Sequence, residues 1–249
     1  DERKARQLAF LNEYLHNHKD VSDKLASLMK TDAALACVMH KLNYPSYYEY
    51  FMKQEADIPT AYFDFLAQVD LNDTQNLMLP AFSSFLESFA TNIAETRVDD
   101  GLNPIEQKAA IVQGAAKVID NTFTNDKIRQ YAYFNTLKQH LDYRCETGVG
   151  PVMAKFRSLA DDETLVDELD SVYKEQKKLA KGNTAPDFSG VDLDGEEVAL
   201  ADLRGDYVYV DVWATWCRPC LAQIPKLKTL EEEYHDKGIT FLSISIDSD

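Results

Sequence analysis

The sequence has few of the features that would set it apart from ordinary globular proteins. Its 249 residues include only four cysteines, nine glycines and eight prolines, too few for a disulfide-rich scaffold or a low-complexity chain. No apolar run approaches the roughly 18–20 residues of a membrane-spanning helix. Basic residues are also scarce, with 26 Lys and Arg against 42 Asp and Glu, so the net charge is −16. We therefore expect no nucleic acid among its partners.

The five histidines show no spacing that is typical of a metal site. His16 and His18 are expected on different faces of one helix, and the other three are far apart in the sequence. A site with four cysteines is disfavoured because the sequence contains one C-x-x-C pair. We expect neither a metal nor a cofactor.

The chemistry-bearing part of the sequence is the octet WATWCRPC, residues 213–220. The run VYVDV over residues 208–212 precedes it and predicts a buried strand. A helical pattern follows and extends to about Tyr234, and a second strand is expected over residues 239–246. Cys217 and Cys220 thus lie where a strand turns into a helix within a β-α-β unit. In that context a C-x-x-C pair indicates a thioredoxin-like redox motif.

The spacing predicts a different role for each cysteine. Cys217 would lie at the helix N-terminus with its sulfur partly exposed, where backbone N–H groups and the helix dipole favour the thiolate. It is the expected nucleophile, and Cys220, one turn further and more buried, is expected to resolve the mixed disulfide. Pro219 suits the first turn, where no hydrogen bond is lost. Pro225 is expected to kink the helix.

Asp211 is the charged residue within the apolar run that precedes the octet. A buried carboxylate there would have a raised pKa and could accept the proton of Cys220 during resolution. The alternative is a solvated residue at a strand edge. We favour the functional interpretation because apolar residues flank Asp211 on both sides.

Three segments resemble the TlpA/ResA-like thiol–disulfide oxidoreductases of the thioredoxin superfamily, of the type found in the Bacteroidota. Residues 182–188 (GNTAPDF) match the G-x-x-A-P-x-F entry segment. Residues 192–205 match the family's hairpin and its D-L-x-G turn, and residues 210–220 match the active-site strand and elbow. The resemblance covers about the last quarter of the chain. Peroxidase chemistry is disfavoured because Ala214 and Val210 stand where a peroxiredoxin has Thr or Ser and Pro.

The resemblance implies an enzyme of the periplasm or cell envelope that exchanges protein thiols and disulfides. By analogy it acts as a reductase, in apocytochrome maturation (cytochrome c biogenesis) or in antioxidant maintenance of envelope thiols. It implies a membrane or periplasmic electron donor, and anchoring through an N-terminal segment absent from this sequence is one alternative. The catalytic residues would be Cys217, Cys220 and Asp211. The residues expected to shape and shield the site are Trp213, Trp216, Arg218 and Pro219.

The sequence departs from the family pattern at two places. The family usually has Glu three residues after the second cysteine, where this sequence has Gln223. The sequence also stops at Asp249, without the cis-proline hairpin and the last helix of a thioredoxin fold. We therefore expect a longer native protein. The sequence also opens at Asp1 without an initiator Met, which predicts a processed or trimmed start.

Residues 1–181 predict helix after helix, so the expected fold class is an N-terminal all-helical domain (1–181) followed by a truncated thioredoxin-like α/β domain (182–249). Asn103, Pro104 and Glu106 form a capping-box start, and a helix is expected to be interrupted or to begin again at Pro80. The expected helices cover residues 2–16, 21–29, 32–42, 47–55, 60–69, 74–96, 104–119, 127–142, 152–159 and 164–179.

Two features of the helical part leave alternatives open. Tyr47, Tyr50 and Phe51 fall on one helical face, so core packing is the expected role and a peptide-binding groove is the alternative. Cys37 and Cys145 are either buried thiols or a disulfide between distant helices, and we favour the two equally.

Two other functions remain compatible with the sequence. In one, the protein is an interaction module whose helical domain binds a partner, and the C-x-x-C pair is purely structural. In the other, the pair is catalytic but works as a disulfide oxidase or isomerase, which differs from a reductase in reduction potential and electron partner. An exposed and readily exchanged Cys217 would favour the enzyme, whereas a buried and inert pair would favour the interaction module.

Overall fold

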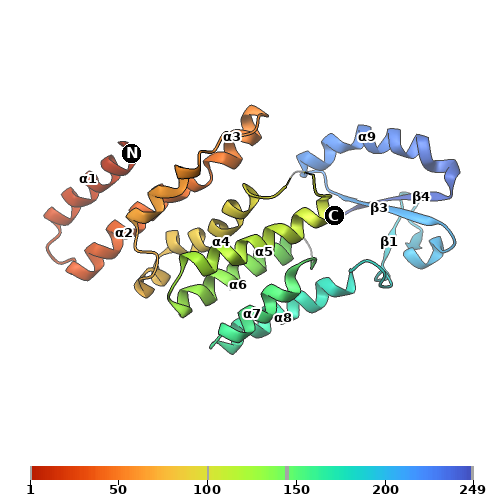
Figure 1. The fold of residues 1–249 in the computed structure, drawn as a ribbon. Helices are drawn as coiled ribbons and strands as arrows, with labels where there is room; N and C mark the ends of the chain where they lie inside the picture. The colour runs from red at the N-terminus through yellow and green to blue at the C-terminus, as the bar shows by residue number, and fades with distance from the viewer. Residues whose placement is uncertain (1, 100, 144–145, 248–249) are drawn as a thin grey trace. The chain divides into compact units, whose positions relative to one another are not determined.

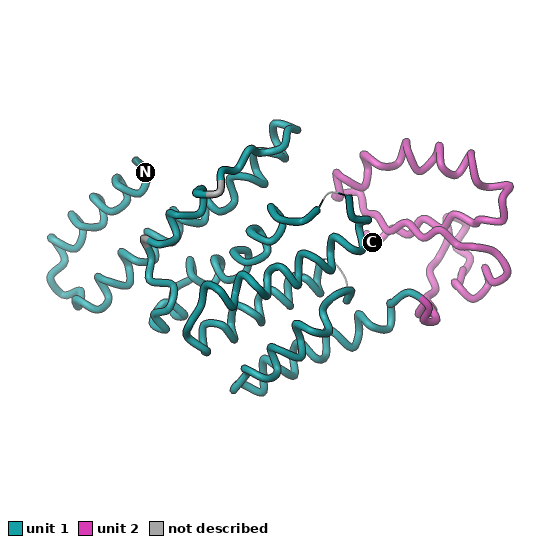
Figure 2. Tube along the Cα trace, in the orientation of Figure 1, with its two compact units in different colours: residues 1–181 teal, residues 182–249 magenta. Residues whose placement is uncertain are grey.

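The computed structural model describes residues 2–99, 101–143 and 146–247. They form two compact units, residues 1–181 and 182–249 (Figure 2). The first unit is built from helices, and the strands of the described residues lie in the second (Figure 1). The predicted fold class, a helical part followed by a thioredoxin-like α/β part, is confirmed.

The elements of the first unit, in chain order, are α1 (Glu2–Asn17), α2 (Asp23–Leu42), α3 (Tyr44–Met52), η1 (Thr60–Gln68), η2 (Thr74–Met78), α4 (Pro80–Glu95), α5 (Pro104–Thr122), α6 (Asp126–Tyr143), α7 (Val149–Leu159) and α8 (Glu163–Lys178). In the described part of this unit, the 3-10 helices η1 and η2 stand between α3 and α4, and the other elements are α-helices.

Local sequence signals fix the start of two of these helices. The side chain of Asn103 accepts hydrogen bonds from the N–H groups of Ile105 and Glu106, both at 3.0 Å, and Glu106 accepts the N–H of Asn103 at 3.1 Å. The predicted capping box is thereby confirmed, because each of the two side chains accepts a backbone N–H at the helix start that would otherwise be unpaired. The predicted restart at Pro80 is also confirmed, since α4 begins there after η2.

The core of the first unit centres on α4, which packs against α2, α5 and α6. Phe82, Phe85 and Phe89 of this helix are buried on one face. The rings of Phe85 and Phe89 stack with their centroids 4.6 Å apart, and Phe89 meets Phe123 edge-on at 5.7 Å. A buried aromatic ring of this kind contributes about 3–5 kcal/mol to stability relative to Ala, so α4 is the element on which the unit is built.

Several predicted helix boundaries are wrong; the helix expected over 47–55, for example, is α3 at Tyr44–Met52, and the one expected over 60–69 is the 3-10 helix η1. The separate helices expected over 21–29 and 32–42 form one helix, α2, because Asp32 does not break it. Its carboxylate instead accepts the N–H of Ala81 at 3.0 Å and satisfies an amide at the start of α4. Helix α7 starts at Val149 rather than at 152, directly after Gly148, which has a φ of 79°. A Cβ at Gly148 would lie 2.6 Å from the Cα of Ala109, so this close approach requires glycine.

The expected core role of the α3 aromatics is also wrong. Tyr47, Tyr50 and Phe51 are 56%, 67% and 74% exposed. Helix α3 is short and buries Pro45, with Tyr48 half-buried. The face with the three rings is therefore largely open to solvent.

The second unit contains a small hairpin and a parallel β-α-β unit. The hairpin pairs β1 (Ser189–Val191) with β2 (Glu197–Ala199) in antiparallel fashion, and η3 (Leu200–Leu203) follows. Strands β3 (Tyr207–Trp213) and β4 (Ile239–Ser245) are parallel and in register from Tyr207↔Ile239 to Trp213↔Ser245. Helix α9 (Arg218–Tyr234) and η4 (His235–Lys237) connect them. The predicted strand-helix-strand order around the C-x-x-C pair is confirmed (Figure 1).

Strand β3 is less buried than its sequence predicts. Val210 and Val212 are 41% and 53% exposed. Among the described residues of this unit, Ala214 alone is a buried hydrophobic residue. A single helix and a two-stranded hairpin cover only part of a two-stranded sheet, which leaves apolar side chains of β3 in contact with solvent. Helix α9 includes Pro225 and continues to Tyr234.

Candidate functional site

The two cysteines of the octet form a disulfide in the structure, with their Cα atoms 5.2 Å apart. Cys217 is the N-cap of α9, and its sulfur accepts the N–H of Cys220 at 3.3 Å. Arg218 and Pro219 occupy the first helical positions, where the missing N–H of proline leaves no carbonyl unpaired. The predicted position of Cys217 at the start of a helix is confirmed.

A tight turn presents Cys217 to this helix start. The N–H of Cys217 donates to the carbonyl of Ala214 at 3.1 Å, which closes the turn between the end of β3 and α9. The sulfur therefore lies at the positive end of the helix dipole, with a backbone N–H directed at it. This is an arrangement that stabilises a thiolate when the pair is reduced.

Burial distinguishes the two cysteines less than expected. Both Cys217 and Cys220 are half-buried, although the sequence led us to expect Cys220 to be clearly more enclosed. The reason is the open surroundings of α9, which has no fully buried residue. Arg218, Pro219 and Gln223 are exposed on the same helix.

Asp211 lies in the middle of β3 and faces a hollow of about 550 Å³ between the sheet and α9. It is half-buried rather than buried, so the expectation of a fully enclosed carboxylate is wrong. The hydroxyl of Ser243, its register partner on β4, donates to Asp211 at 3.5 Å. The rings of Tyr209 and Phe241 lie against each other in the same hollow, with centroids 5.2 Å apart.

The two tryptophans occupy different surroundings. Trp213 ends β3, is half-buried and lines the hollow that Asp211 faces. Trp216, directly before Cys217, is 71% exposed. Trp213 therefore lies where a residue that shapes the hollow would be expected, whereas the largely exposed side chain of Trp216 does not fit the shielding role expected of it.

Sequence reasoning missed Asp247, which connects the end of β4 to the active-site turn. Its carboxylate accepts the N–H of Thr215 at 3.0 Å and the Thr215 hydroxyl at 2.9 Å. The Ser245 hydroxyl also donates to it, at 2.7 Å. These hydrogen bonds, that from Ser245 first, hold the pKa of Asp247 below its usual value. The parallel pairing of the strands was the available signal, because residues that follow two parallel strands lie at the same edge of the sheet.

The remaining two cysteines lie in the first unit. Cys37 is a half-buried free thiol that donates to the side-chain oxygen of Gln7 at 3.0 Å. Cys145 lies outside the residues that the structure describes. The Cys37 thiol therefore packs between α1 and α2, as a small and weakly polar side chain does.

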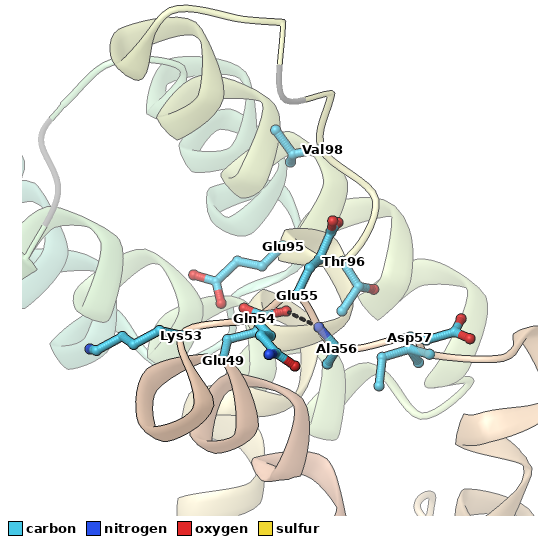
Figure 3. A pocket seen from close by; sticks show the side chains of 10 residues that line it. Glu49, Lys53, Gln54, Glu55, Ala56, Asp57, Glu95, Thr96 and Val98 are labelled. Carbon is cyan, nitrogen blue, oxygen red and sulfur yellow. Dashed lines mark hydrogen bonds between the residues drawn. The ribbon is translucent and has the colours of Figure 1, made fainter.

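A second hollow, of about 790 Å³, lies in the first unit (Figure 3). Half of its lining residues are charged, among them Glu49, Lys53, Glu55 and Glu95, and the N–H of Ala56 donates to Glu49 at 3.3 Å. It contains none of the predicted site residues. Within residues 2–99, 101–143 and 146–247, His, Cys, Asp and Glu form no group of three that could hold a metal ion.

Comparisons with known sequences agree with the location of this site. The Redoxin family model matches residues 180–249. The thiol–disulfide oxidoreductase ResA of Bacillus anthracis is 33% identical over 75 residues, which are 30% of this chain and 43% of the relative. ResA of Geobacillus thermodenitrificans is 38% identical over 74 residues, 30% of this chain and 42% of the relative. The thioredoxin-like protein YneN of Bacillus subtilis is 42% identical over 64 residues, 26% and 38% of the two chains.

Among solved structures, the thioredoxin domain of a thiol–disulfide oxidoreductase from Bacteroides vulgatus is 38% identical. That match covers 28% of this chain and 50% of the other, with a TM-score of 0.27. This chain thus spans less than half the length of the curated relatives it matches. Among the described residues, no helix is both long and apolar enough to cross a bilayer. The resemblance inferred from the motifs is confirmed for the matched part: residues 180–249 match the Redoxin model and are similar to ResA-type thiol–disulfide oxidoreductases.

Proposed function

We propose that this protein is a thiol–disulfide oxidoreductase that works through Cys217 and Cys220. The observation that carries the proposal is the disulfide at the N-terminus of α9, directly after the first strand of a parallel β-α-β unit. The names of the ResA relatives over the same segment support it. The exposure of Trp216 and the merely partial burial of Cys217 also support it, because an enzyme of this kind must admit a protein substrate to the pair.

In the reducing direction, the cycle starts from the dithiol. The Cys217 thiolate attacks one sulfur of a substrate disulfide, and the other substrate sulfur leaves as a thiolate that takes up a proton. A mixed disulfide now links Cys217 to the substrate. The N–H of Cys220 and the start of α9 favour Cys217 as the attacking sulfur, because they stabilise negative charge on it.

Resolution transfers the disulfide back to the protein. Cys220 loses its proton and attacks the sulfur of Cys217, which releases the second substrate thiol and forms the Cys217–Cys220 disulfide seen in the structure. Two electrons have then passed to the substrate. Asp211 is the proposed acceptor of the Cys220 proton, supported by its place on β3 and by the hydrogen bond from Ser243, which orients its carboxylate.

The proposal extends to direction and location. By resemblance to the TlpA/ResA-like proteins, we assign a reductase of protein disulfides in the periplasm or cell envelope, with a membrane or periplasmic electron donor that regenerates the dithiol. Maintenance of apocytochrome or other envelope thiols is the corresponding task. In this assignment the helical unit positions the substrate or a partner.

The rival function is an interaction module in which the C-x-x-C disulfide is structural. The exposed rings of Tyr47, Tyr50 and Phe51 on α3 favour a binding role for the helical unit. The two functions differ in the behaviour of the disulfide. An enzyme exchanges it readily with small thiols, whereas a purely structural pair remains oxidised under the same conditions.

A redox titration tests the proposed function directly. The two tryptophans of the chain, Trp213 and Trp216, both adjoin the site. We would therefore follow tryptophan emission in dithiothreitol buffers of stepped potential, with Cys217→Ser as control. A reversible two-electron transition that the control lacks is expected. A midpoint near about −270 mV supports a reductase and one near about −120 mV an oxidase, while no transition contradicts the enzyme and leaves the interaction module.

A further inference from the structure

We infer that Asp247 is a positioning residue for the redox pair, which holds the turn before Cys217 in place through Thr215. The inference rests on the proposed function, since it assigns a role in thiol–disulfide exchange. It comes from contacts that join two segments 32 residues apart in the sequence. Asp247 does not act on substrate in this assignment; it acts through the backbone that carries Cys217.

Both oxygens of the Asp247 carboxylate are engaged. Oδ1 accepts the Thr215 hydroxyl at 2.9 Å and the Thr215 N–H at 3.1 Å, and Oδ2 accepts the same N–H at 3.0 Å. Oδ2 also accepts the Ser245 hydroxyl at 2.7 Å, while the N–H of Asp247 donates back to that hydroxyl at 3.2 Å. The carboxylate is therefore fixed by its own strand end before it binds Thr215.

The next contact lies two residues before Thr215. The N–H of Ile246 donates to the carbonyl of Trp213 at 3.0 Å and extends the parallel pairing beyond β4. Trp213 and Thr215 are thus both bonded to the chain that follows β4, on either side of the buried Ala214. The turn is therefore hydrogen-bonded at two residues, Trp213 and Thr215, to the chain segment that follows β4.

The turn transmits this restraint to the sulfur. The carbonyl of Ala214 accepts the N–H of Cys217 at 3.1 Å, and Cys217 receives the N–H of Cys220 on its sulfur at 3.3 Å. Loss of the Asp247 contact releases Thr215, in the centre of the turn, so Cys217 is held less firmly at the helix start. A hydrogen bond to sulfur that is formed less often stabilises the thiolate less.

The test compares two substitutions of the same carboxylate in the full chain. Asp247→Ala removes all acceptors, whereas Asp247→Asn keeps one oxygen that can accept both donors of Thr215. We would measure the alkylation rate of reduced Cys217 by iodoacetamide from pH 5 to pH 10, on variants that also carry Cys37→Ser and Cys145→Ser. Asp247→Ala is expected to slow alkylation at neutral pH by about tenfold, because iodoacetamide reacts with the thiolate and the thiolate fraction of Cys217 falls when the helix start stabilises it less.

The pH profile separates positioning from general stability. In Asp247→Ala the rise of the alkylation rate should shift to higher pH, and the midpoint of the dithiothreitol titration should change, while Asp247→Asn keeps the unaltered profile and midpoint. Unfolding alone would give Asp247→Ala the profile of an ordinary thiol, which a urea-unfolded sample also shows, so a profile that lies between those of the folded and the urea-unfolded protein separates the two. Identical profiles for Asp247→Ala and the unaltered residue overturn the inference, as does an Asp247→Asn profile equal to that of Asp247→Ala.

Thr215 provides an independent test if Asp247→Ala does not fold. Thr215→Val removes the hydroxyl donor and keeps the N–H, so a smaller shift in the same direction is expected, and Thr215→Ser should leave the profile unchanged. An unchanged profile in Thr215→Val overturns the inference in that case. The proposed function fails separately, because it requires a redox transition in the protein with Asp247 intact.

Discussion

Asp211 of β3 and Ser243 of β4 are register partners in the parallel pair, and the Ser243 hydroxyl donates to the Asp211 carboxylate at 3.5 Å. The carboxylate is thus oriented by the neighbouring strand, in a hollow that it shares with Trp213 and α9. It lies on the strand that leads into the active-site turn, and it is half-buried. These properties suit a group that exchanges a proton with solvent between turnovers.

Asp211→Asn should slow the resolution step and spare the attack by Cys217. The amide cannot accept the proton of Cys220, and we expect about a tenfold loss, below the roughly hundredfold or more of an enclosed general base, because water reaches a half-buried site. Stopped-flow tryptophan emission with oxidised glutathione resolves the two steps. Ser243→Ala is the matched control, since it removes the orienting donor and leaves the base; equal rates of resolution in Asp211→Asn and the unaltered protein contradict the assignment.

Cys220→Ser should trap the substrate on the protein. Without the resolving thiol, the mixed disulfide with Cys217 persists, so incubation with oxidised glutathione should add the mass of one glutathione at Cys217. Cys217→Ser retains the same other thiols and is the matched control, in which no adduct at residue 220 is expected on the same time scale. Peptide mapping by mass spectrometry locates the adduct. An adduct at Cys220 in Cys217→Ser, together with none at Cys217 in Cys220→Ser, would reverse the assigned roles.

The β-α-β unit and its disulfide were predictable because their signals are local. A β-branched run, a C-x-x-C pair and a helical pattern follow one another within residues 208–234. The Asn103 capping box was predictable for the same reason, since its partners lie three residues apart. In such short-range patterns, the residues that interact all lie within the pattern itself.

Contacts between distant residues were not predictable from these patterns. The Thr215–Asp247 hydrogen bonds depend on the pairing of β3 with β4, and the Asp32–Ala81 bond depends on the packing of α2 on α4. The burial of Tyr47 and Phe51 was predicted wrongly because a helical face indicates periodicity but does not supply the element that covers it. The burial of β3 was overestimated for the same reason, because an apolar run does not supply the elements that would cover the strand.

The acid stability of the second unit should depend on Asp247. Hydrogen bonds from Ser245 and Thr215 lower the pKa of this carboxyl below its ordinary value of 3.8. A lowered folded-state pKa contributes stability that is present above the unfolded value and is lost as pH falls through the folded value. Urea unfolding followed by tryptophan emission, which reports this unit alone, should show the loss below about pH 4. Asp247→Asn should flatten that acid limb, and a limb of equal slope would contradict the prediction.

The stability of the helical unit should depend strongly on Phe89 and hardly at all on Phe51. Phe89 is 2% exposed and contacts Phe85 and Phe123, so Phe89→Ala leaves a cavity and should lower the free energy of unfolding by about 3–5 kcal/mol. Phe51 is 74% exposed, and Phe51→Ala should change the free energy of unfolding by less than about 0.5 kcal/mol. Urea unfolding followed by far-ultraviolet circular dichroism measures both, because helices dominate that signal. A loss in Phe51→Ala as large as that in Phe89→Ala would mean that the α3 aromatics are covered in the folded protein.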